Sequence, residues 1–176
     1  MDAIISRSIR IRYPDFFTIG EGSVVDDFCY FSVKMNIGRF CHIGPNVSII
    51  GGVEEEFRMD DYSAIVAGSR IICSSDDWRF ELNSCLPSSF PIKKGSKKGG
   101  VVFEKFVAAG ANSVIMPDNV LKEGVGIGSL SLVPSKYKFE PWGIYVGIPI
   151  KQIGKRDEAA VKKQAEQVET HLKSEE

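Results

Sequence analysis

Apolar residues recur at every sixth position over long stretches of this chain, and this period is the feature that most narrows its possible folds. The first block holds Ile19, Val25, Phe31, Ile37 and Ile43. Side chains share a face with a period of 3.6 in an α-helix and of 2 in a strand, so neither element explains a period of six. A coil of short strands and tight turns does, and stacked coils bury one continuous apolar column.

A second position keeps the same phase, because a small or apolar residue follows each of these side chains by four. In the first block these residues are Ser23, Cys29, Met35, Cys41 and Val47. The pattern resumes with Met59, Ile65 and Ile71, followed at the same offset by Ser63, Ser69 and Ser75. It resumes again with Phe103, Ala109, Ile115, Leu121, Ile127 and Val133, accompanied by Val107, Ser113, Asn119, Val125 and Ser131. Ala109 and Asn119 are the least typical members.

Glycine directly follows the inward apolar residue in five hexads, at Gly20, Gly38, Gly44, Gly110 and Gly128. Glycine suits the points where the backbone turns between faces. A β-sandwich with frequent glycine turns is the alternative, but it would not hold one phase through five consecutive hexads. The sequence therefore predicts a mainly β fold, a parallel β-helix whose repeat is interrupted between blocks.

The size and charge of the chain limit its organisation and its partners. With 176 residues, 43% of them hydrophobic, the chain is long enough for one core and too short to require two. Lys and Arg number 22 against 23 for Asp and Glu, so no global field favours nucleic acid or an anionic membrane. We expect a single domain that meets any anionic ligand locally.

Targeting signals and a disulfide frame are not expected. The opening MDAIISRSIRIRYP lacks a sustained apolar core, and no segment approaches the roughly 20 apolar residues that span a bilayer. A cytoplasmic protein is therefore expected. The four cysteines lack Cys-x-x-Cys spacing and are expected to be reduced thiols, without a metal site.

Two segments outside the repeat have their own patterns. Ile9, Ile11 and Tyr13 alternate with arginines, which indicates a short strand capping the first coil. Between Asp76 and Gly100 the hexad phase is lost, which predicts a long loop leaving the coil. Loops of this length in a compact domain are often functional.

The C-terminal segment has helical periodicity. Val161, Ala165, Val168 and Leu172 are spaced 4, 3 and 4 apart, which predicts an amphipathic helix over residues 157–174 with a narrow apolar stripe. This helix should dock on the coil or fit a neighbouring subunit. The predicted organisation is a β-helix over residues 1–156, with a loop at 76–100, and a C-terminal helix in residues 157–176.

The hexads, the block GANSVIMP at residues 110–117 and the run EPWGIYVGIPIKQIGKR at residues 140–156 together resemble the hexapeptide-repeat acyltransferases, over about residues 19–156. They look most like bacterial sugar O-acetyltransferases of the galactoside and colanic-acid type. The resemblance implies a left-handed β-helix of triangular section with three hexads per coil. It also implies acetyl-CoA as co-substrate, a homotrimer with active sites between subunits, and a role in lipopolysaccharide or other surface-polysaccharide biosynthesis.

Transfer of an acetyl group to a hydroxyl needs a base, and the sequence offers few candidates. His42 and His171 are the two histidines, and His171 lies near the end of the predicted helix. His42 occupies the sixth position of a hexad, where its side chain should point out of the coil. Because related enzymes use a histidine as base, His42 is the candidate; a contact with CoA or a structural surface position are its alternatives.

The predicted loop opens with SSDDW, where related enzymes often have a similar stretch. Asp76 or Asp77 could orient His42, bind the sugar, act as the base with a pKa raised by burial, or only start an Asx turn. Trp78, Glu81 and Asn83 are candidates for sugar binding.

The CoA candidates lie in the last hexads and beyond. Gly110, Ala111 and Ser129 match family positions that line the pantetheine groove, although plain turn residues would look the same. The remaining candidates follow the last hexads and could meet the CoA phosphates or simply improve solubility: Pro149, Lys151, Lys155 and Arg156.

Several functions remain open at this point. An acetyl-CoA-dependent O-acetyltransferase acting on a saccharide or nucleotide sugar leads, and an N-acetyltransferase of an amino-deoxy sugar nucleotide is the alternative. A non-catalytic β-helix scaffold is an alternative of another class. A γ-type carbonic anhydrase, which shares the fold, needs three histidines on zinc and is rejected because the chain has two.

Overall fold

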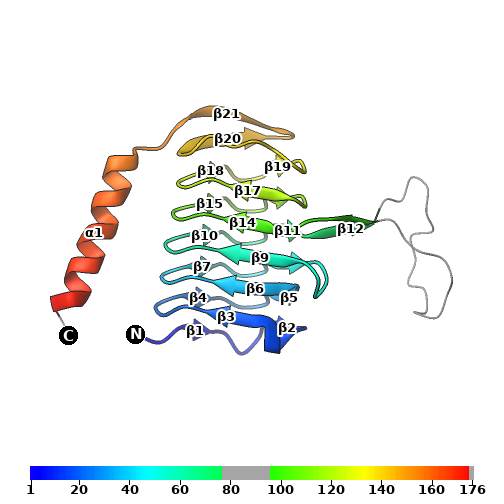
Figure 1. Cartoon of the computed structure of the whole chain (residues 1–176), viewed down its shortest axis with the longest axis horizontal. Helices are drawn as coiled ribbons and strands as arrows, with labels where there is room; N and C mark the ends of the chain where they lie inside the picture. The colour runs from blue at the N-terminus through cyan, green and yellow to red at the C-terminus, as the bar shows by residue number, and fades with distance from the viewer. Residues whose placement is uncertain (77–95, 175–176) are drawn as a thin grey trace.

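The structure is a computed structural model that describes residues 1–76 and 96–174. In this part of the chain, short parallel strands stack into the three faces of a left-handed β-helix (Figure 1). Most parallel crossovers are right-handed, so this coil is an exception to the usual rule. The prediction of a mainly β, left-handed parallel β-helix is confirmed.

The three faces are named here A, B and C. In stacking order, face A contains β1 (Ile4–Ile5), β4 (Val24–Val25), β7 (His42–Ile43), β10 (Ala64–Ile65), β15 (Ala108–Ala109), β18 (Gly126–Ile127), β20 (Gly143–Gly147) and β21 (Ile150–Lys155). Face B contains β2 (Arg10–Ile11), β5 (Tyr30–Ser32), β8 (Ser48–Ile50), β11 (Arg70–Ile72), β16 (Val114–Ile115) and β19 (Leu132–Val133). Face C contains β3 (Phe17–Ile19), β6 (Lys34–Ile37), β9 (Glu56–Met59), β14 (Val101–Phe103) and β17 (Asn119–Leu121), with a 3-10 helix (Pro14–Phe16) before it.

Three edges join the faces. The A–B edge consists of the turns at 26–29, 44–47, 66–69, 110–113 and 128–131, and of the β20–β21 turn at the top. The C–A edge consists of the turns at 20–23, 38–41, 60–63, 104–107 and 122–125. At the B–C edge, β12 (Ser74–Asp76) and β13 (Ser96–Lys98) pair antiparallel and leave the coil. The interruption of the repeat is therefore located at this edge.

The hexad positions form the core. All the inward positions predicted from the period are buried except Ile19, which is half-buried in the first coil, and Ser75, which lies in β12 outside the coil. The atypical Asn119 is buried because its amide donates to the carbonyls of Met116 and Pro134 and accepts from the backbone N–H of Tyr137. A polar side chain is tolerated in the column where neighbouring backbone groups satisfy it.

An aromatic ladder follows the C–A edge. Its rings are Phe40, Tyr62, Phe106 and Trp142, with successive centroids 5.4, 5.6 and 5.8 Å apart. All four residues have φ between 53° and 65°, a region that residues other than glycine rarely occupy. Phe40, Tyr62 and Phe106 come from successive coils, whereas Trp142 reaches Phe106 across the coil that has Gly124 at this position.

The helix α1 (Glu158–Ser174) runs back along this ladder from the end of β21 (Figure 1). Tyr62 donates its hydroxyl hydrogen to Glu169, whose Oε1 lies 3.6 Å from the guanidinium of Arg39. Lys162 pairs with Glu123 at 2.9 Å and lies over the Trp142 ring. The helix thus docks on its own coil, one of the two expected positions, although none of its residues is fully buried.

No helix among the described residues is long and apolar enough to cross a membrane.

Candidate active site

His42 projects from the outer side of face A. Its inward neighbour Ile43 is fully buried, whereas the His42 side chain is 56% exposed. The ring Nε2 lies 2.8 Å from Oδ2 of Asp26, which belongs to the coil before it. Because Val24 is the register partner of His42, Asp26 is its diagonal neighbour, two residues further along the same outer side.

Small residues continue from His42 along face A. The outward positions aligned with it in the next three coils are Ala64, Ala108 and Gly126. Neighbouring strands lie about 4.8 Å apart, so this column extends about 14 Å from His42. This line of small outward residues is called here the face A column; at its end, Cδ of Arg156 lies 3.4 Å from the position of a Cβ on Gly126.

The A–B edge borders the face A column and carries three of the predicted CoA residues. Gly110 and Ala111 form the turn after β15, and the exposed Ser129 lies in the same turn one coil further on. A Cβ on Gly110 would lie 2.6 Å from the backbone nitrogen of Ser129. Glycine is therefore required for the two turns to stack this closely, whether or not a ligand binds there.

The predicted basic cluster is divided. Pro149 lies in the turn between β20 and β21, and Lys151 follows it at the A–B end of β21, opposite Val146. Lys155 lies at the other end of the strand, opposite Gly143. Since β21 runs antiparallel to β20 across face A, Pro149 and Lys151 join the A–B edge whereas Lys155 is carried to the C–A edge.

Arg156 departs from its predicted role in phosphate binding. Its guanidinium donates to the carbonyls of Phe106 at 2.5 Å and Gly124 at 2.9 Å, and lies over the ring of Trp142. Burial lowers the pKa of Arg156. The two carbonyls and the Trp142 ring hold the guanidinium in place. Arg156 anchors the segment between β21 and α1 to the coil, so its contacts are structural.

The predicted acidic residues are placed only in part. Asp76 ends β12, on the hairpin that leaves the B–C edge, whereas His42 lies on face A; the described carboxylate on His42 is that of Asp26. Asp77, Trp78, Glu81 and Asn83 lie outside the described residues. The structure therefore places His42 on face A and places Gly110, Ala111, Ser129, Pro149 and Lys151 along the bordering A–B edge, two to five strands further along the stack, whereas Asp76, Lys155 and Arg156 do not lie on this edge.

Sequence reasoning missed Asp26. Three hexads per coil place residue 24 beneath residue 42, so Asp26 is identifiable as the diagonal neighbour once the coil length of eighteen residues is used. The eighteen-residue spacing of the coils was therefore enough to identify Asp26 from the sequence.

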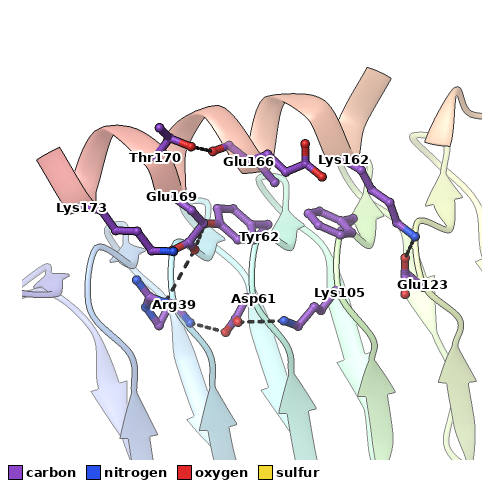
Figure 2. A pocket seen from close by; sticks show the side chains of 12 residues that line it. Arg39, Asp61, Tyr62, Lys105, Glu123, Lys162, Glu166, Glu169, Thr170 and Lys173 are labelled. Atoms are coloured by element: carbon purple, nitrogen blue, oxygen red, sulfur yellow. Dashed lines mark hydrogen bonds and ion pairs between the residues drawn. The ribbon is translucent and has the colours of Figure 1, made fainter. Parts of the chain in front are cut away.

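A cavity of about 700 Å³ lies between α1 and the C–A edge (Figure 2). Its cations are Arg39, Lys105, Lys162 and Lys173, and its acids are Asp61, Glu123, Glu166 and Glu169. Asp61 accepts from the backbone of Arg39 at 2.8 Å and pairs with Lys105 at 3.4 Å, while Lys162 pairs with Glu123. Because the charges balance and several are paired, this cavity does not favour an anionic ligand.

No group of His, Cys, Asp or Glu suited to a metal ion occurs within residues 1–76 and 96–174.

Comparisons with known proteins agree on one family. No protein-family model matches the chain. A dTDP-4-amino-4,6-dideoxy-D-glucose acyltransferase from Escherichia coli is 33% identical over 147 residues, which cover 81% of this chain and 73% of the relative. This relative is a sugar acyltransferase, as the sequence resemblance implies.

Solved structures match over a greater length. AntD, an N-acyltransferase from Bacillus cereus in complex with dTDP and 3-hydroxybutyryl-CoA, is 30% identical with a TM-score of 0.86, covering 97% of this chain and 88% of that one. A variant of AntD, with a TM-score of 0.81 and 30% identity over 96% of this chain and 91% of that one, holds dTDP-4-amino-4,6-dideoxyglucose and coenzyme A. A hexapeptide-repeat acetyltransferase from Vibrio cholerae, at 18% identity and a TM-score of 0.63 over 78% of this chain and 73% of that one, shares the fold.

Proposed function

Because this chain belongs to the hexapeptide-repeat acyltransferase family of left-handed β-helix proteins, we propose that it transfers an acyl group from coenzyme A to the amino group of a nucleotide-linked amino-deoxy sugar. The observation that carries the proposal is the 33% identity with an acyltransferase named for dTDP-4-amino-4,6-dideoxy-D-glucose. The AntD complexes with dTDP, this amino sugar and CoA support the same pair of substrates.

The acceptor atom is the main change from the sequence analysis, which put a hydroxyl first and an amine second. Both relatives named above favour the amine. An amine enters partly deprotonated and asks less of a base than a hydroxyl does, which agrees with the short supply of bases in this chain. We propose lipopolysaccharide or other surface-polysaccharide biosynthesis as the use of the product, and the cytoplasm as its location.

We assign His42 as the base of this reaction. The amine lone pair attacks the thioester carbonyl to form the C–N bond, and the proton on nitrogen passes to the imidazole. Collapse of the tetrahedral intermediate breaks the C–S bond, its electron pair goes to sulfur, and the proton on the imidazole can follow to give CoA thiol. The 56% exposure of His42 leaves the imidazole accessible to both substrates.

The face A column is the proposed path of the pantetheine arm to His42. Ala64 and Ala108 offer no side chain beyond Cβ, so a narrow chain can lie against them, whereas Arg156 packs at Gly126. On the bordering A–B edge, Gly110, Ala111 and Ser129 are the proposed contacts. Pro149 and Lys151, at the end of this edge, are proposed to contact the CoA phosphates, because a cation suits a phosphate. We assign neither Lys155 nor Arg156 to CoA.

A homotrimer with sites between subunits completes this proposal. Large apolar side chains are exposed along the A–B edge, at Phe28 (68%), Val66 (46%), Leu130 (67%) and Ile148 (74%). A row of this kind is typical of a surface that another subunit covers. Because Asp76 and the hairpin leave from the opposite B–C edge, a second copy is the simplest source of acidic or sugar-binding groups near His42.

The test offers two nucleotide sugars to the purified chain. With acetyl-CoA or 3-hydroxybutyryl-CoA, dTDP-4-amino-4,6-dideoxyglucose should release thiol and yield an acylated product by mass spectrometry. Under the same conditions dTDP-glucose, with a hydroxyl at that carbon, should release none. Acylation of dTDP-glucose but not of the amino sugar would show that the acceptor atom is a hydroxyl oxygen. If the chain does not bind acetyl-CoA at millimolar concentration in calorimetry, the alternative of a non-catalytic β-helix scaffold is favoured.

A further inference from the structure

From the contact between Asp26 and His42 we infer that Asp26 is a positioning residue: it fixes the proton of His42 on Nε2 and thereby leaves Nδ1 to accept the proton of the acceptor amine. This inference rests on the proposed role of His42 as base. It adds a residue from the turn after β4 to the machinery of the reaction.

The geometry restricts the imidazole to one arrangement. An ionised carboxylate can only accept hydrogen bonds, so at 2.8 Å from Oδ2 of Asp26 the Nε2 of His42 must carry a hydrogen. The neutral ring has one hydrogen to place, so its lone pair is on Nδ1. Within residues 1–76 and 96–174, no hydrogen bond of the structure engages Nδ1, so this nitrogen is available to a substrate.

The two residues are held by the coil itself. Val25 and Ile43 are buried inward neighbours in paired strands, which fixes the backbone on both sides of the contact. Asp26 and His42 then face outward from adjacent coils: His42 lies in β7, and Asp26 is the first residue of the short turn that directly follows β4.

The negative charge on Asp26 also favours the next step, in which His42 becomes an imidazolium. When Nδ1 takes the proton, the ring becomes an imidazolium with hydrogens on both nitrogens, and Nε2–H remains bonded to Asp26. A carboxylate at this distance stabilises the cation that forms, without itself becoming protonated. Replacing the carboxylate by an amide removes this charge and allows the amide N–H to donate to Nε2, which moves the ring proton to Nδ1 and blocks the base.

Asp27 provides a matched control. It is the next residue and also acidic, but its Oδ1 accepts from the hydroxyl of Ser8 at 2.7 Å and from the hydroxyl of Ser6. These bonds lower the Asp27 pKa. Asp27→Asn therefore removes the same charge from the same turn without touching the imidazole.

The experiment combines kinetics with a direct reading of the tautomer. In a His171→Gln background, His42 is the single histidine, and its ring nitrogens are followed by long-range proton–nitrogen NMR after histidine labelling, at pH 8. We expect an Nε2–H signature in the parent and in Asp27→Asn, and a shift towards Nδ1–H in Asp26→Asn. We expect kcat of Asp26→Asn to fall about tenfold or more, with KM for both substrates within about twofold, as for an interaction made only in the transition state.

Each outcome decides the matter. An unchanged Nε2–H signature in Asp26→Asn overturns the inference, and so does a shifted tautomer with unchanged kcat while His42→Asn is inactive. If the parent acylates no nucleotide-linked amino sugar, the proposed function fails instead, and the tautomer still shows whether Asp26 fixes the ring. An equal loss of kcat in Asp27→Asn would mean that only the charge of the turn matters, which also overturns the inference.

Discussion

The indole ring of Trp142 occupies the space that a side chain at position 124 would need: a Cβ built on Gly124 would lie 2.2 Å from Cε3 of the ring. Gly124 also has a φ of +72°, where glycine is favoured. The same relationship occurs near the first coils, where a Cβ on Gly22 would lie 2.4 Å from the ring of Phe40. Gly22 thus leaves room for the ring of Phe40 one coil on, and Gly124 leaves room for Trp142 to stack on Phe106 across its own coil.

Replacing Gly124 by alanine should therefore destabilise the fold. The left-handed backbone and the forced movement of a 6% exposed Trp142 together predict a loss of about 2–4 kcal/mol in the free energy of unfolding, measured by denaturant titration at fixed protein concentration. Gly52→Ala is the control, because nothing lies within 4 Å of the added Cβ. Equal stability of the two variants would contradict this account of the ladder.

Buried thiols should make the fold sensitive to alkali. Burial raises the pKa of Cys73 to about 12 and that of Cys41 to about 11, and it also raises the pKa of Cys29, from an ordinary value of 9.0. The unfolded chain therefore loses these protons first. Their contribution to stability is complete below pH 9 and declines as the pH rises towards the folded-state values, by up to about 1.4 kcal/mol per thiol and pH unit.

The test compares the pH dependence of unfolding between pH 8 and 10.5 with that of Cys41→Ser. Serine fits this column, since its neighbours at the same position are Ser23 and Ser63, both buried. We expect the variant to lose less stability per pH unit above pH 9 than the parent. Parallel curves would show that Cys41 does not contribute to the alkaline decline.

The period of six was sufficient to predict the core, because each inward residue depends only on its neighbours one coil away. Phe31, Ile65 and Ile115, from three different blocks, are all buried. The same logic placed His42 on the outer side of the coil. Local repetition therefore determines both what is buried and which residues share an edge.

Features that break the repeat could not be predicted in this way. The antiparallel return of β21 separates Lys155 from Lys151, and no hexad pattern reports the direction of a strand after Val133. The structural role of Arg156 depends on carbonyls from two different coils. Such contacts arise from tertiary packing between segments that share no period.

The docking of α1 should depend on Tyr62. Tyr62→Phe removes the hydroxyl that bonds Glu169 while keeping the ring in the ladder. Since no residue of α1 is buried, polar contacts carry much of the docking, and we expect its backbone amides to exchange hydrogen about threefold faster or more by mass spectrometry. Lys163→Gln, on an exposed position of the helix, should leave exchange unchanged. Identical exchange in both variants would assign the docking to the aromatic contacts.

The base assignment predicts a selective loss of turnover. His42→Asn should lower kcat about a hundredfold or more while leaving CoA affinity, measured by calorimetry, nearly unchanged. His171→Asn, on the exposed side of α1, should retain normal turnover. Near-normal kcat in His42→Asn would move the role to Asp76 or Asp77, which would then be replaced in turn.

The trimer prediction separates the A–B edge from the other apolar positions on the surface. Sedimentation equilibrium should give a mass of about three times 19.4 kDa. Leu130→Lys places a charge in the exposed row of the A–B edge and should shift the protein towards the monomer, because an unpaired ammonium is costly to bury in an apolar interface. Val120→Lys, at a 43% exposed position on face C, should remain trimeric. Turnover should fall with the trimer fraction in Leu130→Lys, since the site between subunits is lost when they separate, and a fully active monomer would place the whole site within one chain.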